Sequence, residues 1–252
     1  NNGLKYYEFQ ENRSLFQPFY EYWEKRVYKS ASHVFFVGTW GVLADLRTGN
    51  WSHVENGVEN ELLEYHLNAP TAPNDRSLRL AMIAKVMPHH NLGVLAKALN
   101  DYKGNLPVAL TLIGQGFEHF VSEVNNSNVQ IIEAGILPRS KALRLLATSH
   151  CGIVTCAEPF PSHMKLLDYA AVGLQAIVPK TNCLNHYYNA EVVSFYHPSS
   201  SSELLEIIRT CAENADSCKA KGKKLQLFVK QNYTWEKIFG AKSFVMKAIL
   251  EK

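Results

Sequence analysis

Residues 157–173, AEPFPSHMKLLDYAAVG, combine an acidic residue, two prolines, a serine, a histidine and a lysine with the apolar stripe of a helix. The stripe predicts a helix over 163–172 that begins near Ser162 or His163. The first backbone amides of a helix have no partner within it, and its dipole is positive there, so this segment is suited to bind phosphate. Asp168 would lie about one and a half turns further on, where its carboxylate can accept hydrogen bonds from sugar hydroxyls. The alternative is that Asp168 is a surface residue and the prolines only shape a turn.

Three side chains that can carry positive charge follow the apolar run at 78–84: Lys85, His89 and His90. They precede a helical pattern at 92–102, so they would gather where a strand runs into a helix. Such a cluster is suited to an anion. The alternative is a solvated loop with an ordinary turn proline.

Glycines occupy the loops after the next two apolar runs. Gly114 and Gly116 either let the backbone approach a ligand or make a tight turn. Further on, Gly135 and Pro138 shape a loop, and Ser140 is placed to cap the following helix.

The elements that position these residues are short apolar runs alternating with amphipathic helical stretches from residue 78 onward. Continuous apolar strands joined by helices indicate a parallel sheet covered on both faces. We therefore predict an α/β, doubly wound, Rossmann-like domain, whose ligand lies at the carboxyl ends of the strands. The predicted strands are 78–84, 108–114, 129–132, 151–155, 174–178 and 192–196, and the predicted helices are 92–102, 139–149, 163–172, 202–231 (entered from a capping serine run, 199–202) and 235–250.

The first 60 residues have a different, aromatic-rich character. Phe19, Trp23 and Val27 are spaced four apart and predict a helix over 17–31, followed by a strand at 34–37. A polar, proline-containing stretch then resembles a linker. These shifts in composition predict four segments, namely 1–60, a linker at 61–77, the α/β domain at 78–231 and a C-terminal helix at 232–252.

The composition excludes several classes of protein. The chain has 252 residues, 46% of them hydrophobic, and a net charge of +3, which is typical of a globular protein. Such balanced charge argues against a nucleic-acid-binding protein. A lysine cluster at 219–224 is a solvated helix face or, alternatively, a contact for an anionic membrane surface.

The expected location is the cytoplasm, with the membrane surface as a second location. No apolar stretch reaches the roughly 20 residues of a membrane-spanning helix, and no signal-peptide pattern opens the chain. The cysteines are odd in number and lack paired metal-ligand spacing, so we expect reduced thiols, with Cys151 and Cys156 as small core residues. The five cysteines are Cys151, Cys156, Cys183, Cys211 and Cys218.

In their order and spacing, these segments resemble the retaining GT-B glycosyltransferases of family 4, or group 1, mainly their C-terminal donor-binding domain. The main match is 165–173, KLLDYAAVG, which stands in the place of the family's KLLEYMAxG. Weaker matches are NGVE at 56–59, LIGQG at 112–116, the turn at 132–137 and YTWE at 233–236.

The resemblance implies transfer of a sugar from a nucleotide diphosphate sugar to a hydroxyl of a carbohydrate or glycoconjugate acceptor, as in polysaccharide or glycoconjugate biosynthesis. It assigns two catalytic carboxylates: Asp168 would hold the ribose hydroxyls and Glu158 would touch the transferred sugar. Lys85 and His90 would contact the diphosphate, and Ile136 and Leu137 the nucleobase. The other implied donor-binding residues are Gly114, Gly116, Pro161, Ser162, His163, Met164 and Lys165.

The resemblance further implies that residues 1–60 close an N-terminal, acceptor-side Rossmann-like domain, so that this chain supplies mainly the donor-binding half. Cations and the helix terminus would stabilise the departing diphosphate, so no metal or other cofactor is expected. Glu158 and Asp168 are further apart than the family's acidic pair. Because of this wider spacing, one alternative is that the chain is a non-catalytic nucleotide-sugar-binding or partner subunit of GT-B ancestry. A second alternative is a GT-B sugar-nucleotide epimerase.

Overall fold

The computed structural model describes residues 17–37, 51–63, 76–156 and 164–240. The chain divides into two compact units: a larger one at 57–234, and a smaller one of residues 1–56 together with 235–252. The predicted helix start at Ser162 or His163 lies outside the described residues. The domain boundaries stay a prediction.

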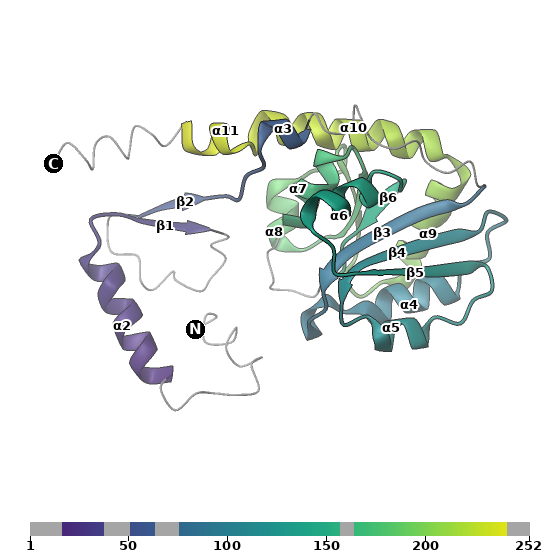
Figure 1. Cartoon of the computed structure of the whole chain (residues 1–252), viewed down its shortest axis with the longest axis horizontal. Coiled ribbons are helices and arrows are strands. Elements are labelled where there is room, and N and C mark those ends of the chain that lie inside the picture. The colour runs from purple at the N-terminus through teal and green to yellow at the C-terminus, as the bar shows by residue number, and fades with distance from the viewer. Residues whose placement is uncertain (1–16, 38–50, 64–75, 157–163, 241–252) are drawn as a thin grey trace. The chain divides into compact units, whose positions relative to one another are not determined.

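A six-stranded parallel sheet forms the centre of the larger unit (Figure 1). The strand order is β5-β4-β3-β6-β7-β8. The chain moves outward from β3 to β5, returns beside β3 as β6, and then moves outward in the other direction. This doubly wound arrangement confirms the fold predicted from the sequence. The strands are β3 (Leu78–Lys85), β4 (Val108–Gln115), β5 (Val129–Gly135), β6 (Cys151–Ile153), β7 (Gln175–Pro179) and β8 (Val193–Tyr196).

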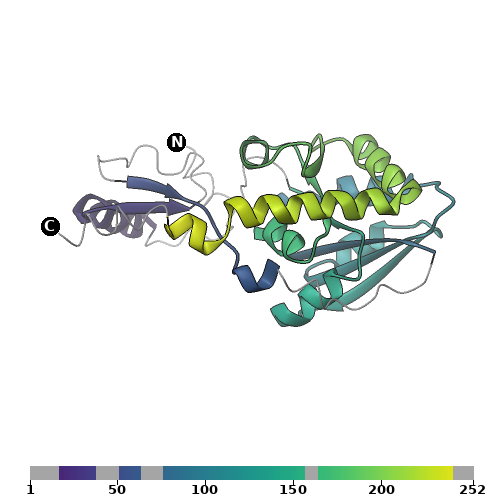
Figure 2. The same cartoon turned by 90° about the horizontal axis from the view of Figure 1, so that it is seen from above.

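Helices cover both faces of this sheet and enclose two apolar cores (Figures 1 and 2). One face carries α4 (Leu92–Asn100), α5 (Glu118–Glu123) and α9 (Ser201–Glu213). The other carries α6 (Arg139–Leu146), α7 (Met164–Ala171) and α8 (Asn182–Tyr187). The long helix α10 (Ala215–Asn232) packs on α7 and β7. Cys218, near its start, belongs to the core under α4, α5 and α9, and Leu225, further along, belongs to the core under α6, α7 and α8.

Tyr169 joins α7 to the central strands. Its ring is fully buried, and its hydroxyl donates a hydrogen bond to the carbonyl of Ile153, 2.9 Å away. Gly152 lies against the ring, where an added Cβ would come within 2.5 Å of it. Helix α7 is therefore fixed in position relative to the sheet by packing and by a buried hydrogen bond.

Several element boundaries differ from the prediction. Strand β5 continues to Gly135, and the predicted helix at 202–231 is two helices that meet at Asn214. Ser200 caps α9 through its hydroxyl, as the serine run predicted. The capping role expected for Ser140 is wrong, because α6 begins one residue earlier and Pro138 holds the cap position. Short helices such as α5 and α8 were not predicted, since few residues form their apolar pattern.

The smaller unit contains α2 (Gln17–Ser30), β1 (Val34–Val37), β2 (Trp51–Val54) and α11 (Trp235–Gly240). Helix α2 and strand β1 confirm the helix predicted at 17–31 and the strand predicted at 34–37. Strand β2 pairs parallel with β1, Val34 opposite Trp51, and was not predicted because its four residues, WSHV, include polar ones.

Two further expectations concern cysteines and membranes. Cys151 and Cys156 are buried, which confirms their core positions, and no disulfide joins Cys151, Cys156, Cys211 and Cys218. Within the described ranges, no helix combines the length and apolar character needed to cross a membrane.

Candidate functional site

The implied site residues that the structure describes lie at the carboxyl edge of four neighbouring strands, β5, β4, β3 and β6. Two more short elements occur in this unit, η3 (Pro88–His90) directly after β3 and α3 (Asn60–Leu63). Glu158, Pro161, Ser162 and His163 lie outside the described residues. The others are Lys85 at the end of β3 and His90 in η3, Gly114 near the end of β4 and Gly116 directly after it, Ile136 and Leu137 after β5, and Met164, Lys165 and Asp168 in α7.

A direct contact between Lys165 and His90 spans the point where the strand order reverses. Lys165 Nζ lies 2.8 Å from His90 Nε2. His90 belongs to η3, which follows β3, and Lys165 belongs to α7, which follows β6. In open parallel sheets, ligands bind beside this reversal, so the pair occupies the expected ligand position.

Lys165 is the cation of this pair at neutral pH. Burial and the charge of Lys165 lower the pKa of the His90 ring to about 4. Burial lowers the pKa of Lys165 to about 8, which leaves the amine largely protonated at pH 7. The Met87 amide donates to His90 Nδ1 at 2.9 Å, and the same Nδ1 lies 3.3 Å from the Met87 carbonyl oxygen. The direction of the hydrogen bond between His90 Nε2 and the Lys165 amine therefore follows the tautomer of the ring.

The expected charge of the two histidines needs a correction. Burial also lowers the pKa of His89, with a further contribution from Lys165. The His90 ring is therefore neutral at pH 7, and the His89 ring is less charged than that of an ordinary histidine, because desolvation disfavours the charged form. Lys85 is exposed at the end of β3 and remains a second basic side chain at this edge.

Local sequence fixes the loop that carries His90. Pro88 occupies the first position of η3, where its missing amide hydrogen costs nothing. Asn91 adopts a left-handed conformation with φ 48°, which asparagine tolerates better than most residues. Its side-chain amide donates to the carbonyl of Pro198, 3.2 Å away. His90 itself is only 7% exposed, so its ring is held in one position.

Asp168 is bound by Arg139, which also contacts Glu59. Arg139 donates to Asp168 Oδ1 from Nη2 at 3.0 Å and from Nε at 3.3 Å. The third contact runs from Arg139 Nη1 to Glu59 Oε2, at 3.4 Å. Burial raises the pKa of Asp168, and the hydrogen bonds and charge of Arg139 oppose that shift. Asp168 is therefore a partly buried carboxylate held by a specific cation.

Arg139 and Glu59 were not predicted as site residues. Arg139 is the first residue of α6 and directly follows the β5 loop. Its position after a strand of the parallel sheet was the signal that could have identified it. Glu59 belongs to the NGVE segment, which was recognised only as a family match.

The glycines at the carboxyl end of β4, Gly114 within the strand and Gly116 directly after it, occupy positions where the backbone conformation favours glycine. Gly114 has φ 125°, and a Cβ there would overlap the carbonyl oxygen of Ala84 on the neighbouring strand. Gly116 has φ 86°, and a Cβ there would lie 3.1 Å from Cβ of Val86. Both positions favour glycine without any ligand, which agrees with the tight-turn alternative.

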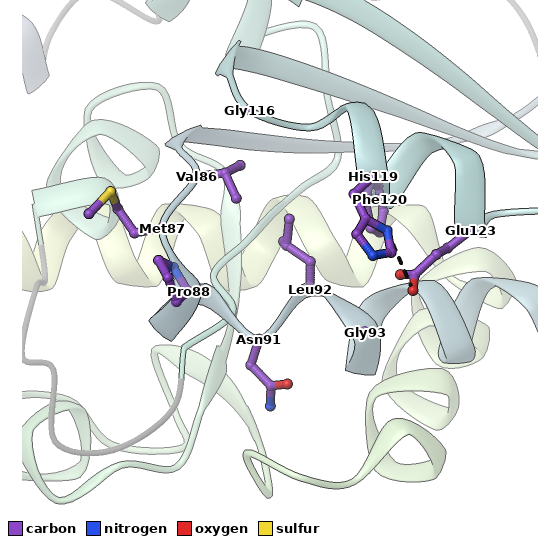
Figure 3. A pocket seen from close by; sticks show the side chains of 10 residues that line it. All are labelled: Val86, Met87, Pro88, Asn91, Leu92, Gly93, Gly116, His119, Phe120 and Glu123. Atoms are coloured by element: carbon purple, nitrogen blue, oxygen red, sulfur yellow. Dashed lines mark ion pairs between the residues drawn. The ribbon is translucent and has the colours of Figure 1, made fainter. Parts of the chain in front are cut away.

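A pocket of about 350 Å³ opens between the loop after β3 and the loop after β4 (Figure 3). Val86, Leu92 and Phe120 provide apolar walls. At one side, His119 and Glu123 of α5 face each other with 3.6 Å between Nδ1 and Oε1. Among the implied donor-binding residues, Gly116 is the one that lines this pocket.

Comparison with protein families finds one relevant model. Residues 94–241 match the family described as glycosyl transferase-like. No curated protein sequence matches the chain.

Solved structures with the same fold include HepE from Anabaena, with a TM-score of 0.69 and 17% identity over 94% of this chain and 70% of HepE. Sucrose-phosphate synthase from Thermosynechococcus elongatus has a TM-score of 0.72 and 15% identity over 99% of this chain and 66% of the synthase. The catalytic domain of cholesterol-α-glucosyltransferase from Helicobacter pylori has a TM-score of 0.52 and 16% identity over 61% of this chain and 98% of that domain. Because the sequence identities are 15–17%, these similarities show that the fold is shared and nothing more.

Proposed function

The chain belongs to the glycosyl transferase-like family, and on that premise we propose that its larger unit binds the nucleotide diphosphate sugar used by a retaining glycosyltransferase. The resemblance of the sequence to GT-B glycosyltransferases is confirmed by the family match and by the fold. HepE has been solved with UDP and glucose and with UDP-glucose, which makes UDP-glucose the first donor to test. The acceptor is a hydroxyl of a carbohydrate or glycoconjugate.

The observation that carries the proposal is the contact between Lys165 and His90 at the reversal of strand order. A lysine ammonium has three N–H donors, and the contact with His90 uses at most one of them. A diphosphate placed at this edge would accept from the others. Negative charge grows on the diphosphate as the sugar departs, so a positioned cation accelerates that step. The neutral His90 ring holds the Lys165 amine in position, and because the ring is uncharged at pH 7 it does not itself attract the diphosphate.

Asp168 is proposed to hold the ribose. Both hydrogen bonds from Arg139 go to Oδ1, and among the described residues Oδ2 accepts none. Ribose hydroxyls can donate to Oδ2, while Arg139 fixes the direction of the carboxylate. Lys165 and Asp168 are three residues apart on α7, which places them on neighbouring turns of one helix face.

The remaining assignments follow from the same proposal. Residues 1–60 would close the acceptor-side domain, 61–77 would link it to the donor-binding domain at 78–231, and 232–252 would form the C-terminal helix. Glu158 would contact the transferred sugar, and Ile136 and Leu137 the nucleobase. Ile136 is 73% exposed, which leaves its side chain available for such a contact.

Calorimetric titration of the chain with UDP, GDP, ADP and TDP tests nucleotide binding. We expect one nucleotide to bind, and Asp168→Ala to weaken it at least tenfold because charge-assisted hydrogen bonds to the ribose are lost. Asp101→Ala removes an exposed carboxylate at the end of α4 and serves as the matched control. Absence of binding by any nucleotide, or equal losses in the two variants, would contradict the proposal.

Turnover separates an enzyme from a binding subunit. With the nucleotide identified, release of free sugar or transfer from the corresponding nucleotide sugar is measured by chromatography. Turnover that disappears in Asp168→Ala supports a transferase. Tight binding without turnover would favour the non-catalytic alternative.

A further inference from the structure

Three buried thiols meet at the edge of the sheet opposite the proposed donor site. The sulfur atoms of Cys151, Cys211 and Cys218 all lie within 4.8 Å of one another, and all three residues are buried. Cys151 is the first residue of β6, so the cluster lies at the amino edge of the strands. The proposed function makes no use of these groups.

The cluster is assembled from elements far apart in the sequence. Cys151 comes from β6, Cys211 from the last turn of α9, and Cys218 from the first turn of α10. The residue preceding the first thiol, His150, has both ring nitrogens 3.0 Å from nitrogen atoms of Arg79. His150 is thus engaged elsewhere, and the three sulfurs form the donor set.

The spacing of the sulfurs suits a soft metal ion. Zinc–thiolate bonds of about 2.3 Å, at tetrahedral or trigonal angles, place sulfur atoms about 3.8 to 4.0 Å apart. A separation of at most 4.8 Å therefore requires shifts of under about 1 Å to bring all three thiolates to one ion. Soft thiolate ligands select ions such as Zn²⁺ and exclude Mg²⁺ and Ca²⁺.

Polar groups around the sulfurs match the charge of such a complex. Gln175 Nε2 lies 3.5 Å from Cys211 Sγ and donates to Ser194 Oγ at 2.9 Å. Lys221 Nζ donates to the same hydroxyl oxygen at 3.0 Å and lies within electrostatic range of Cys211 and Cys218. Three thiolates and a divalent ion carry a net charge of −1, which the ammonium of Lys221 balances. Partners of this kind orient metal ligands and tune their affinity.

We propose that Cys151, Cys211 and Cys218 bind one Zn²⁺-class ion through three thiolates, with Lys221, Ser194 and Gln175 as the supporting polar shell. Binding releases three thiol protons and leaves one position of a tetrahedral ion for a ligand from solvent. The ion would join β6, α9 and α10 and thereby stabilise the amino edge of the domain.

Titration of the full chain with Cd²⁺, after phosphine reduction and chelation, tests the site directly. The sulfur-to-cadmium charge-transfer absorbance should saturate at one ion per chain. Cys211→Ser and Cys218→Ser should each abolish saturation at this ratio, while Cys156→Ser, which removes a buried thiol outside the cluster, should keep it. Zn²⁺ should raise the melting temperature of the unmutated protein by mass action, and Cd²⁺ should displace the Zn²⁺, because the softer ion binds thiolates more tightly.

A variant at the half-buried Lys221, outside the thiol cluster, keeps the test valid if the cysteine-to-serine substitutions impair folding. Lys221→Met should weaken Cd²⁺ binding about tenfold while leaving the stoichiometry and the circular dichroism spectrum unchanged. The proposal is overturned if the unmutated protein shows no saturating band, or if Lys221→Met binds Cd²⁺ as tightly as the unmutated chain.

Discussion

Arg139 joins two carboxylates that are 109 positions apart in the sequence, since its guanidinium contacts Asp168 at 3.0 Å and Glu59 at 3.4 Å. The two contacts differ in burial: the Asp168 side chain is 20% exposed and that of Glu59 is 46% exposed. The shorter and more buried contact uses two guanidinium nitrogens. Arg139 therefore orients Asp168 mainly, with Glu59 as a second anchor.

Double-mutant cycles should rank these two contacts. For Arg139→Gln with Asp168→Asn, we expect a coupling free energy of about 1 kcal/mol, and for Arg139→Gln with Glu59→Gln about 0.3 kcal/mol, because solvent screens the exposed pair more strongly. Urea denaturation of the single and double variants measures both values. A larger coupling for Glu59 would contradict the assigned order.

Lys165→Met should weaken binding of the nucleotide diphosphate by about 10- to 100-fold, because a charge-assisted hydrogen bond contributes about 1.5 to 3 kcal/mol. Lys103→Met removes an exposed lysine in the loop before β4 and should leave the affinity unchanged. Calorimetry at pH 7 provides the comparison. Similar losses in both variants would indicate a general charge effect instead of a contact with the phosphates.

Nucleotide affinity should fall as the pH rises from 7 to 9. The pKa of Lys165 is lowered to about 8 by burial, so the unbound protein loses the ammonium over this interval. An anion binds the protonated form, and each unit above the pKa then costs up to about tenfold in affinity. Titrations at pH 7, 8 and 9 measure the slope. Lys165→Met should remove it, and an unchanged slope in that variant would assign the effect to another group.

The free energy of unfolding should decrease as the pH falls from 6.5 to 4, and His90 should account for part of that loss. The pKa of His90 is about 4 in the folded chain against 6.5 for an ordinary histidine, so in this window the unfolded chain binds a proton that the folded chain does not. The contribution is about 1 kcal/mol per pH unit. Urea denaturation of His90→Asn should give a shallower pH dependence.

His119→Gln is the matched control for that experiment. The His119 side chain is 84% exposed and pairs with Glu123 on the same helix. The variant should retain the acid sensitivity of the unmutated protein. Equal slopes for all three proteins would mean that the His90 ring is protonated at the same pH in both states.

Gly114→Ala should destabilise the fold by about 3 kcal/mol or more, because the added Cβ meets a backbone carbonyl of β3 at a φ that alanine disfavours. Gly93→Ala is the control within α4, where the added Cβ has nothing within 4 Å. There, alanine should stabilise the helix by about 0.5 to 1 kcal/mol. Thermal denaturation of the two variants should thus shift in opposite directions.

Much of the architecture could be predicted from the sequence because its signals are local. The run VALTLIG at 108–114 is apolar throughout, as a strand buried on both faces requires, and the stripe of α7 repeats with helical spacing. Alternation of such segments is enough to predict a doubly wound parallel sheet. Short elements such as α5 and β2 were missed, since four to six residues show too little periodicity.

The sequence by itself determined which longer elements form, their order, and the edge of the sheet where Lys85, Gly114 and Asp168 would gather. Only the tertiary structure decided the partners: Lys165 with His90, Arg139 with Asp168, and the three thiols with one another. The physical reason is that these contacts join residues from 7 to 75 positions apart, and the charge of His90 depends on burial that no local pattern encodes.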